Sequence, residues 1–443
     1  ASLPKTKCVR NTLRTLHPIN SSKFEVEMGE EEEQNDDFYI DEFGEEQDID
    51  DEQELDGDED DNEPGGDEGE VVDELGGGGG GADGVANKSY YPEWSWDHTR
   101  PWVAIRRADA YSDDQIRQLA AQDVVMLEKA NGMKTHGSIE KGTLAAAKRI
   151  KALNSKVKIL FYLNSMVHYG GYEANDNWND EWAMRTKEND FYKWRDRLLC
   201  YDHNNTEFRE WWIQRGLEMV AHDEIDGIFI DGIVKTDKKF LPVKRHGLAY
   251  FQTARELRKR LPEGKLLIGN GLRAKTSNKN SYRKHLQYLD GSYLEGWCVQ
   301  ERLAPTLDLM SYALKIGRII MLNAHPLHYD KALFNKMKSL DRRYDFIQKE
   351  EYIGFPLGFF LLSVAPNSYF SYRTSVDANP KQLAVFDNTR FEAVMRKLGK
   401  PLGDYVKESE YEYSREFEHL KVQVNLQTMK GVLTVKDDKG EEL

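Results

Sequence analysis

Two acidic residues, Asp231 and Glu295, each lie at the end of a short apolar segment that is typical of a buried strand. Asp231 follows the run Gly227–Ile230, and Glu295 lies within Ser292–Trp297. Side chains that follow buried parallel strands gather at the carboxyl edge of the sheet, where barrel enzymes place their chemistry. We therefore interpret both residues as candidate catalytic groups. The alternatives are that Asp231 only caps a turn and that Glu295 forms a salt bridge with Arg273.

A pair of carboxyl groups in one polar cleft is suited to glycoside hydrolysis. One group attacks the sugar or activates water, and the other protonates the leaving oxygen. We predict Asp231 as the nucleophile, on a tight turn with Gly232 behind it. Glu295 is the predicted general acid/base, since the nearby indole of Trp297 would favour its protonated form. A separation of about 5–5.5 Å between the carboxyl groups predicts retention of configuration, and a wider gap predicts inversion.

Other predicted strands also end in polar residues that suit a sugar site. Amide groups both donate and accept hydrogen bonds, so Asn164, Asn270 and Asn323 are suited to binding sugar hydroxyls. One or two of these strand-end residues are expected to be turn formers only. The full set of predicted substrate-binding residues is Asp109, Glu128, Tyr162, Asn164, His168, Trp178, Asn270, Trp297, Asn323 and His325.

A long loop after the third predicted strand is rich in aromatic residues. Aromatic faces stack on the apolar faces of pyranose rings, so this loop could form substrate subsites. A small satellite core beneath a long loop explains the same composition equally well. The residues concerned are His168, Tyr169, Tyr172, Trp178 and Trp182.

Other kinds of chemistry find little support in the sequence. The spacing of His168, His325 and His328 is not diagnostic of metal ligands, so we predict no metal and no cofactor. A Gly-X-Ser-X-Gly turn for a nucleophilic serine is absent. Basic clusters such as Lys235–Lys239 and Arg255–Arg260 are interpreted as solvated helix faces, and no nucleic-acid partner is predicted.

Strands and helices are expected to alternate along most of the chain, which predicts a (β/α)₈ TIM barrel. A doubly wound open sheet is disfavoured, because the segment after the first strand, Arg106–Tyr111, has no Gly-rich phosphate turn. The predicted strands are Trp102–Asp109, Val124–Ala130, Lys158–Ser165, Gly227–Asp231, Lys265–Asn270, Ser292–Trp297, Arg318–Asn323 and Ser368–Tyr372.

The 443 residues divide into three predicted parts. Residues 1–89 form a disordered acidic tail and a Gly-rich linker, and residues 90–375 form the barrel. Residues 376–443 form a C-terminal extension with a β-hairpin made of Phe417–Asn425 and Gly431–Lys436.

The net charge of −16 is concentrated in the tail. Residues 30–74 hold 26 Asp or Glu and no Lys or Arg, and six consecutive glycines follow at Gly76–Gly81. Self-repulsion predicts an extended, solvated spacer. The alternatives are loose calcium binding and docking on a basic protein partner, although Asp48–Glu63 lacks the ligand spacing of a calcium-binding helix–loop–helix.

Weak signals point to a location outside the cell. Asn-X-Ser/Thr acceptor triplets occur at Asn20, Asn87 and Asn204, and a first residue other than Met is compatible with a removed signal peptide. We therefore expect a secreted or cell-surface glycoprotein. No apolar run is long enough to span a membrane, so no membrane span is predicted.

Three cysteines provide no disulfide framework. Cys200 and Cys298 either pair or remain as two reduced core thiols, and Cys8 lies in the tail.

The chain resembles a group of glycoside-hydrolase barrels, the hypothetical glycosyl hydrolase group provisionally numbered fifteen. The resemblance extends from about Tyr90 to Val435. It implies a (β/α)₈ barrel with carbohydrate-directed activity, in which Asp231 and Glu295 occupy the matching acidic positions. The segments that carry it are Lys158–Ser165, Asp226–Asp231, Ile268–Gly271, Leu294–Trp297, Leu398–Gly403 and Ser414–Glu418.

These observations predict a glycoside hydrolase that acts on a polysaccharide or glycan by a two-carboxylate, retaining mechanism. The alternative is a catalytically inactive barrel that binds glycans or serves as an extracellular structural protein.

Overall fold

An eight-stranded parallel sheet forms the centre of the computed structural model, which describes residues 88–233, 246–274, 283–378, 383–437 and 439–442. Strand order is β1-β2-β3-β6-β7-β8-β9-β10. The strands are β1 (Trp102–Ile105), β2 (Val124–Leu127), β3 (Lys158–Asn164), β6 (Gly227–Asp231), β7 (Leu266–Gly269), β8 (Gly291–Leu294), β9 (Ile319–Ala324) and β10 (Ser368–Tyr372).

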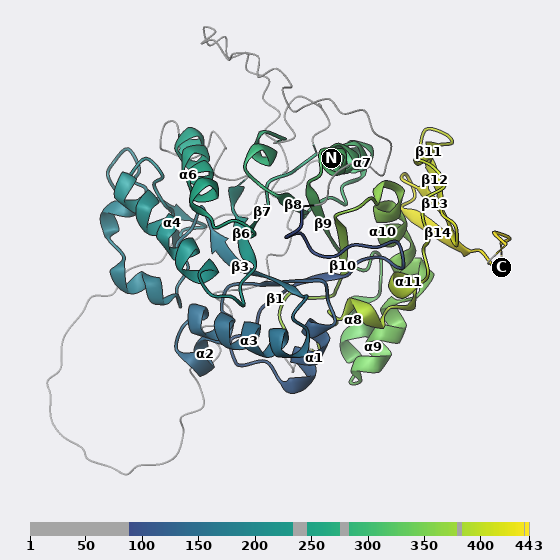
Figure 1. Ribbon diagram of the computed structural model, residues 1–443, viewed down its shortest axis with the longest axis horizontal. Helices are drawn as coiled ribbons and strands as arrows, with labels where there is room; N and C mark the ends of the chain where they lie inside the picture. Colours follow the sequence, from purple (N-terminus) through teal and green to yellow (C-terminus); the bar gives the residue numbers. More distant parts are fainter. Residues whose placement is uncertain (1–87, 234–245, 275–282, 379–382, 438, 443) are drawn as a thin grey trace, which may run out of the picture. The chain divides into compact units, whose positions relative to one another are not determined.

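The last strand returns to the first and closes the sheet. Pro101 and Phe370 form a parallel bridge, and the Phe370 amide donates to the Arg100 carbonyl at 2.9 Å. Helices surround the sheet (Figure 1). The fold is therefore the predicted (β/α)₈ barrel.

Several helices on the outside of the barrel begin at polar caps. Ser112 and Gln115 form a capping box at α1, Ser138 caps α3 and Asn205 caps α4. The helices are α1 (Asp113–Ala120), α2 (Met133–His136), α3 (Ile139–Leu153), α4 (Thr206–Val220), α6 (His246–Arg260), α7 (Leu303–Lys315), α8 (Lys331–Lys336), α9 (Leu340–Ile347), α10 (Glu350–Ser363) and α11 (Glu392–Met395).

The core has separate layers inside and outside the barrel. Residues that alternate along the strands fill the barrel interior, including Trp102, Tyr162, Phe229, Tyr293 and Tyr369. The residues between them face outward and pack against the helices. Each strand is therefore buried on both faces, which explains the near-continuous apolar runs in the sequence.

The amino-terminal end of the barrel is covered by residues 88–94. Asp290, directly before β8, is the centre of this contact. Its carboxylate pairs with Lys88 Nζ at 2.9 Å and Arg258 Nη1 at 2.8 Å, and it accepts from the Tyr90 hydroxyl at 3.0 Å. The Trp94 indole donates to the Ser368 carbonyl at 3.0 Å. This segment therefore fixes the barrel base, at the opposite end of the strands from Asp231 and Glu295.

A four-stranded antiparallel sheet packs on α10 near the C-terminus (Figure 1). Its strands are β11 (Val406–Lys407), β12 (Glu412–Glu416), β13 (Leu420–Asn425) and β14 (Lys430–Val435). A Cβ atom at Gly354 would lie 2.4 Å from the Gly431 carbonyl oxygen, so this contact requires the glycine in α10. The sheet contains the predicted hairpin and two further strands.

Several boundaries differ from the sequence expectations. β6 and β10 have the predicted bounds, whereas β1 ends at Ile105 instead of Asp109 and β8 ends at Leu294 instead of Trp297. β2, β3 and β7 also end earlier than predicted, at Leu127, Asn164 and Gly269, whereas β9 ends one residue later, at Ala324. A 3₁₀ helix, Arg283–Gln287, precedes β8.

Cys200 and Cys298 are free thiols, so the disulfide alternative is wrong. Within the described residues no helix is long and apolar enough to cross a membrane. The predicted acidic tail, the glycine linker, Cys8, Asn20 and Asn87 lie outside these residues.

We predict that Asp290→Ala lowers the free energy of unfolding by about 3 kcal/mol, because it leaves partly buried cations without their carboxylate. Urea denaturation of the full chain, followed by circular dichroism, measures this effect. Asp341→Ala is the matched control, since it removes only an exposed pair with Arg390 and should cost less than about 1 kcal/mol. Equal losses in the two variants would contradict the role of Asp290.

Candidate active site

Polar residues occupy the carboxyl end of the barrel at regular positions. Each lies two residues after a residue that packs in the barrel interior, so each faces the same way. The eight positions, in strand order, are Arg106, Glu128, Asn164, Asp231, Asn270, Glu295, Asn323 and Ser371. Six of these were among the predicted site residues, and the two that were not are Arg106 and Ser371.

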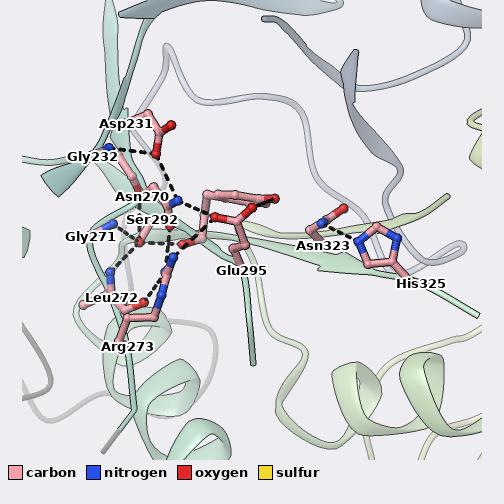
Figure 2. Close-up of polar contacts among 12 residues, drawn as sticks. Asp231, Gly232, Asn270, Gly271, Leu272, Arg273, Ser292, Glu295, Asn323 and His325 are labelled. Carbon is pink, nitrogen blue, oxygen red and sulfur yellow. Dashed lines mark hydrogen bonds and ion pairs between the residues drawn. The ribbon is translucent and has the colours of Figure 1, made fainter. Parts of the chain in front are cut away.

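Asn270 joins the two candidate catalytic carboxylates. Its Nδ2 donates to Asp231 Oδ1 at 3.1 Å and to Glu295 Oε2 at 2.8 Å. Figure 2 shows the amide between the two acidic side chains. The strand order β6-β7-β8 produces this arrangement, because Asn270 follows the middle strand of the three.

The shared amide limits the distance between the two carboxyl groups. The bonded oxygens of Asp231 and Glu295 cannot be further apart than the sum of their distances to Asn270 Nδ2, 3.1 Å and 2.8 Å. The two N–H bonds of a planar amide point about 120° apart, which places the oxygens about 5 Å from each other. One oxygen of Asp231 therefore lies close to one oxygen of Glu295, on either side of the Asn270 amide.

Asp231 is surrounded by hydrogen-bond donors. The Tyr162 hydroxyl donates to Oδ2 at 2.6 Å, and the Gly232 amide donates to Oδ1 at 2.7 Å. Burial, followed by the charge of Asp231, raises the pKa of Tyr162, so the phenol keeps its proton. Gly232 has a φ of +81°, a conformation that favours glycine, and this turn presents its amide to the carboxylate.

Glu295 interacts with a cation and a second phenol. Arg273 Nη2 lies 3.4 Å from Oε2, and the Tyr293 hydroxyl lies 3.4 Å from Oε1. Arg273 Nη1 also donates to Asn270 Oδ1 at 2.7 Å, which turns the amide nitrogen toward both carboxylates. The predicted salt bridge to Arg273 is thus present together with the carboxylate pair, so the two interpretations do not exclude each other.

The loop that carries Arg273 is anchored from β8. The Ser292 hydroxyl accepts from the amides of Gly271 at 3.3 Å and Leu272 at 3.1 Å, and donates to the Gly269 carbonyl at 3.0 Å. These contacts, drawn in Figure 2, hold the backbone on both sides of Asn270. Ser292 therefore determines where the amide lies.

The end of β3 is fixed from outside the barrel. Ser165 Oγ donates to the Asp231 carbonyl at 2.7 Å, and His203 Nε2 lies 2.7 Å from the Ser165 carbonyl. The Trp212 indole donates to the Asn164 carbonyl at 2.8 Å. Helix α4 and the segment before it thus position the strand that pairs with β6.

The structure uses the predicted amides in different ways. Asn164 is committed to its own loop, since Oδ1 accepts from the amides of Met166 and Val167, both at 2.8 Å, and Nδ2 donates to Tyr162 at 3.0 Å. Asn323 Nδ2 lies 3.1 Å from His325 Nε2 on the far side of Glu295 from Asp231 in Figure 2.

The two other acidic residues predicted for the site, Glu128 and Asp109, lie further from the carboxylate pair in the hydrogen-bond network. Glu128 is half-buried directly after β2, and its charge reaches both Tyr162 and Tyr293. Asp109 is exposed, four residues beyond the end of β1, and among the described residues it has no hydrogen bond to the carboxylate pair. Asp109 therefore lies beyond the strand, whereas the other candidate residues lie at the strand ends.

The aromatic loop packs largely on itself and on α4. The His168 and Trp178 rings lie 4.2 Å apart, and Trp178 contacts Trp182 and Trp211 at 5.8 Å and 5.7 Å between ring centroids. Burial, with the charge of Arg215, lowers the pKa of His168 to about 4. These contacts form a satellite cluster, and a subsite role for His168 and Trp178 stays a prediction.

Tyr169 is the loop residue that reaches the barrel mouth. Lys129 Nζ lies 5.0 Å from the Tyr169 ring and 5.2 Å from the Tyr162 ring. Lys129 is nearly buried directly after Glu128. The sequence singled out neither Lys129 nor Tyr293 for the site, although Tyr293 lies two residues before Glu295 and so shares its face.

Trp297 has a structural position. Its ring stacks on Phe359 at 4.7 Å, within the core between the barrel and α10. The indole nitrogen donates to the Asn323 carbonyl at 2.7 Å. The expected role of this indole beside the Glu295 carboxyl is therefore replaced by a role in the core that fixes the end of β9.

No group of three or more His, Cys, Asp or Glu side chains within the described part of the chain could hold a metal ion.

The chain is similar in structure to several glycoside hydrolases of known structure. The glycoside hydrolase domain of PelA from Pseudomonas aeruginosa is 12% identical, covering 65% of this chain and 98% of its own, with a TM-score of 0.39. A maltogenic alpha-amylase, AmyB from Thermotoga neapolitana, is 14% identical, covering 76% of this chain and 88% of its own, with a TM-score of 0.43. The alpha-galactosidase AgaB from Geobacillus stearothermophilus is 11% identical, covering 75% and 48% respectively, with a TM-score of 0.40. No curated protein matches the chain.

The family model described as hypothetical glycosyl hydrolase family 15 matches residues 151–421. This match covers more than half of the chain and includes the strands from β3 to β10, with Asp231, Asn270 and Glu295. The chain therefore belongs to hypothetical glycosyl hydrolase family 15.

Proposed function

We propose that the protein hydrolyses a polysaccharide or glycan with retention of configuration, using Asp231 as nucleophile and Glu295 as general acid/base. The observation that carries this proposal is the amide of Asn270, which donates to both carboxylates at 3.1 Å and 2.8 Å. The resulting separation of about 5 Å is the one typical of retaining enzymes and leaves no room for a water between the second carboxylate and the sugar.

Asp231 is suited to attack because all of its described partners donate hydrogen bonds. The Tyr162 hydroxyl, the Gly232 amide and the Asn270 amide favour the ionised carboxylate. In the first step a carboxylate oxygen forms a bond to the anomeric carbon, and the bond from that carbon to the leaving oxygen breaks. The product of this step is a covalent glycosyl-enzyme.

Glu295 is placed to supply the proton. It gives this proton to the leaving oxygen in the first step. In the second step it takes a proton from water, whose oxygen forms a bond to the anomeric carbon as the bond from that carbon to Asp231 breaks. Both carboxyl groups then return to their starting states. In the free protein, the Asn270 amide at 2.8 Å and Arg273 Nη2 at 3.4 Å favour the ionised form of Glu295. A bound sugar that excludes water would favour the protonated form.

His325 is not suited to replace Glu295 as the proton donor. Its Nδ1 donates to the Arg373 carbonyl at 2.9 Å, and its Nε2 accepts from Asn323 Nδ2 at 3.1 Å. Desolvation by the surrounding protein, together with the charge of Arg373, lowers the pKa of His325 to about 4. The ring is therefore neutral at physiological pH, and its one proton is already committed.

A location outside the cell and a partner or calcium for the acidic tail remain predictions. Asn204, the acceptor triplet within the described residues, is exposed. Its modification in the protein purified from its source would support secretion.

We expect Asp231→Asn and Glu295→Gln to abolish most hydrolysis, because each removes one of the two reacting groups. The loss should be on the order of 10² to 10⁴-fold in kcat. A polysaccharide panel with reducing-end detection identifies a substrate, and NMR of the first-formed anomer reads the stereochemistry. Asp341→Asn, on the surface of α9, is the matched control.

Unchanged hydrolysis in both variants would contradict the catalytic assignment, and an inverted product would contradict the nucleophile. Binding to a glycan array without turnover would favour the non-catalytic alternative.

We also expect His325 to titrate near pH 4 instead of its ordinary 6.5. Because the folded pKa is lowered, the folded state takes up this proton later than the unfolded state as pH falls. His325 therefore favours folding most above pH 6.5, and this contribution decreases as the pH falls from 6.5 to 4. NMR of the ring, assigned with His325→Asn, measures the midpoint. A midpoint above 6 would contradict the neutral ring.

A further inference from the structure

Arg373 follows β10 directly and lies at the same end of the barrel as the carboxylate pair. Only 5% of the residue is exposed. Its amide donates to the Ala324 carbonyl at 3.1 Å, which continues the pairing of β10 with β9. It lies two residues after Ser371 and four after Tyr369, so it extends the inward-facing row of β10.

The guanidinium of Arg373 is held in one orientation by a small ring of hydrogen bonds. Nε donates to Asn323 Oδ1 at 2.9 Å, and the Arg373 carbonyl accepts from His325 Nδ1 at 2.9 Å. Asn323 Nδ2 completes the ring at 3.1 Å from His325 Nε2. Orientation of a charged group by neighbouring hydrogen bonds is typical of residues that bind a ligand.

The terminal nitrogens of this guanidinium are not used within the described structure. Neither Nη1 nor Nη2 of Arg373 forms a hydrogen bond or an ion pair with a described residue, and neither is sealed from solvent. Other cations near the barrel ends have carboxylates: Arg273 pairs with Glu295 and Arg258 with Asp290.

The guanidinium lies next to the proposed sugar site. Its charge acts on Tyr293, whose hydroxyl contacts Glu295 Oε1 at 3.4 Å. Its hydrogen-bond partner Asn323 lies on the side of Glu295 away from Asp231 (Figure 2). A substrate that reaches both carboxylates and extends past Glu295 would therefore meet the Nη groups of Arg373.

A buried cation without a counter-ion is unfavourable, so its retention at a site needs a reason. The hydroxyl of Ser371, on the same face of β10, is also buried without a hydrogen-bond partner. The Nη groups of Arg373 and the hydroxyl of Ser371 thus lack a partner within the described residues. A guanidinium whose Nε is already committed presents its two Nη groups as a planar fork, which matches a pair of anionic oxygens.

We propose that Arg373 binds an anionic substituent, a uronate carboxylate or a sulfate ester, on the sugar that lies beside Glu295. The substrate class is therefore an acidic polysaccharide or glycan. This inference rests on the proposed hydrolase function for the placement of the sugar, but the binding step can be measured without turnover.

Titration calorimetry on the full chain tests the proposal with three probes. Trigalacturonate carries carboxylates, a sulfated galactan oligosaccharide carries sulfates, and the carboxyl-reduced trisaccharide is the neutral control. We expect one anionic probe to bind at least about tenfold more tightly than the neutral one, and its affinity to fall as salt is raised. The better anionic probe identifies which of the two substituents is recognised.

Variants then assign the effect to Arg373. Arg373→Gln should weaken binding of the anionic probe about 10- to 100-fold and leave the neutral probe within about twofold. Arg373→Lys keeps the charge but loses the planar fork, so its affinity for the anionic probe should lie between those of the native chain and Arg373→Gln. Arg117→Gln, on the exposed surface of α1, should behave as the native chain. Thermal unfolding shows whether each variant is folded. The preference of the native protein for the anionic probe over the neutral one is measured without any variant.

Equal binding of the neutral and anionic probes by the native chain would overturn the proposal, and so would unchanged anionic binding in a folded Arg373→Gln. The two proposals fail separately. Arg373-dependent anion binding without hydrolysis of any glycan would remove the hydrolase function and keep this inference. Hydrolysis of neutral glycans alone would keep the hydrolase function and remove the inference about Arg373.

Discussion

The hydrogen bonds from one amide nitrogen to two carboxylates are the interaction on which the site depends. Two ionised carboxyl groups about 5 Å apart repel by about 3 kcal/mol at an effective dielectric constant near 20. Asn270 opposes this by donating to both Asp231 and Glu295. A cation at the same position would neutralise the charge of Asp231, and an apolar residue would leave the repulsion unopposed.

The rest of the barrel keeps this amide in place. Arg273 orients it and Ser292 holds its backbone, while Tyr162 and Gly232 fix Asp231 from the other side. These residues come from four neighbouring strands and the loops that follow them, so their geometry depends on the parallel register. The base, closed around Asp290, holds the same strands at their other ends and thereby supports that register.

Much of the fold could be predicted from the sequence because buried parallel strands are apolar on both faces. Gly227–Asp231 and Ser368–Tyr372 were bounded correctly for this reason. Strands β11 and β12 were missed, since the segment Glu412–Glu416 is mostly polar and buries only Tyr413 and Arg415. Alternation of buried and exposed residues along such a strand is recognised only once the helix that it packs on, α10, is known.

The site was less predictable than the fold, because strand position indicates where a residue lies but not where its side chain is committed. Trp297 follows Glu295 closely but turns into the core, and Asn164 is occupied by its own loop. Arg373 could not be predicted as a site residue, because nothing in the sequence shows that an arginine after an apolar strand will have no carboxylate partner. Residues two apart on a strand share a face, so Tyr293 could have been predicted for the site from its position two residues before Glu295.

The shared amide also exposes the site to chemical ageing. Asn270 is followed by Gly271, a pair in which the glycine nitrogen can attack the side-chain amide and release ammonia. In the folded protein Ser292 accepts from that nitrogen and Arg273 holds the amide oxygen, so the attacking geometry is blocked. Unfolded chains have no such protection, and their deamidation would place a third carboxylate between the other two. Each excursion from the native state therefore risks a chain that refolds with an altered site. Stability of the barrel preserves the chemical identity of the residue that lies between its carboxylates.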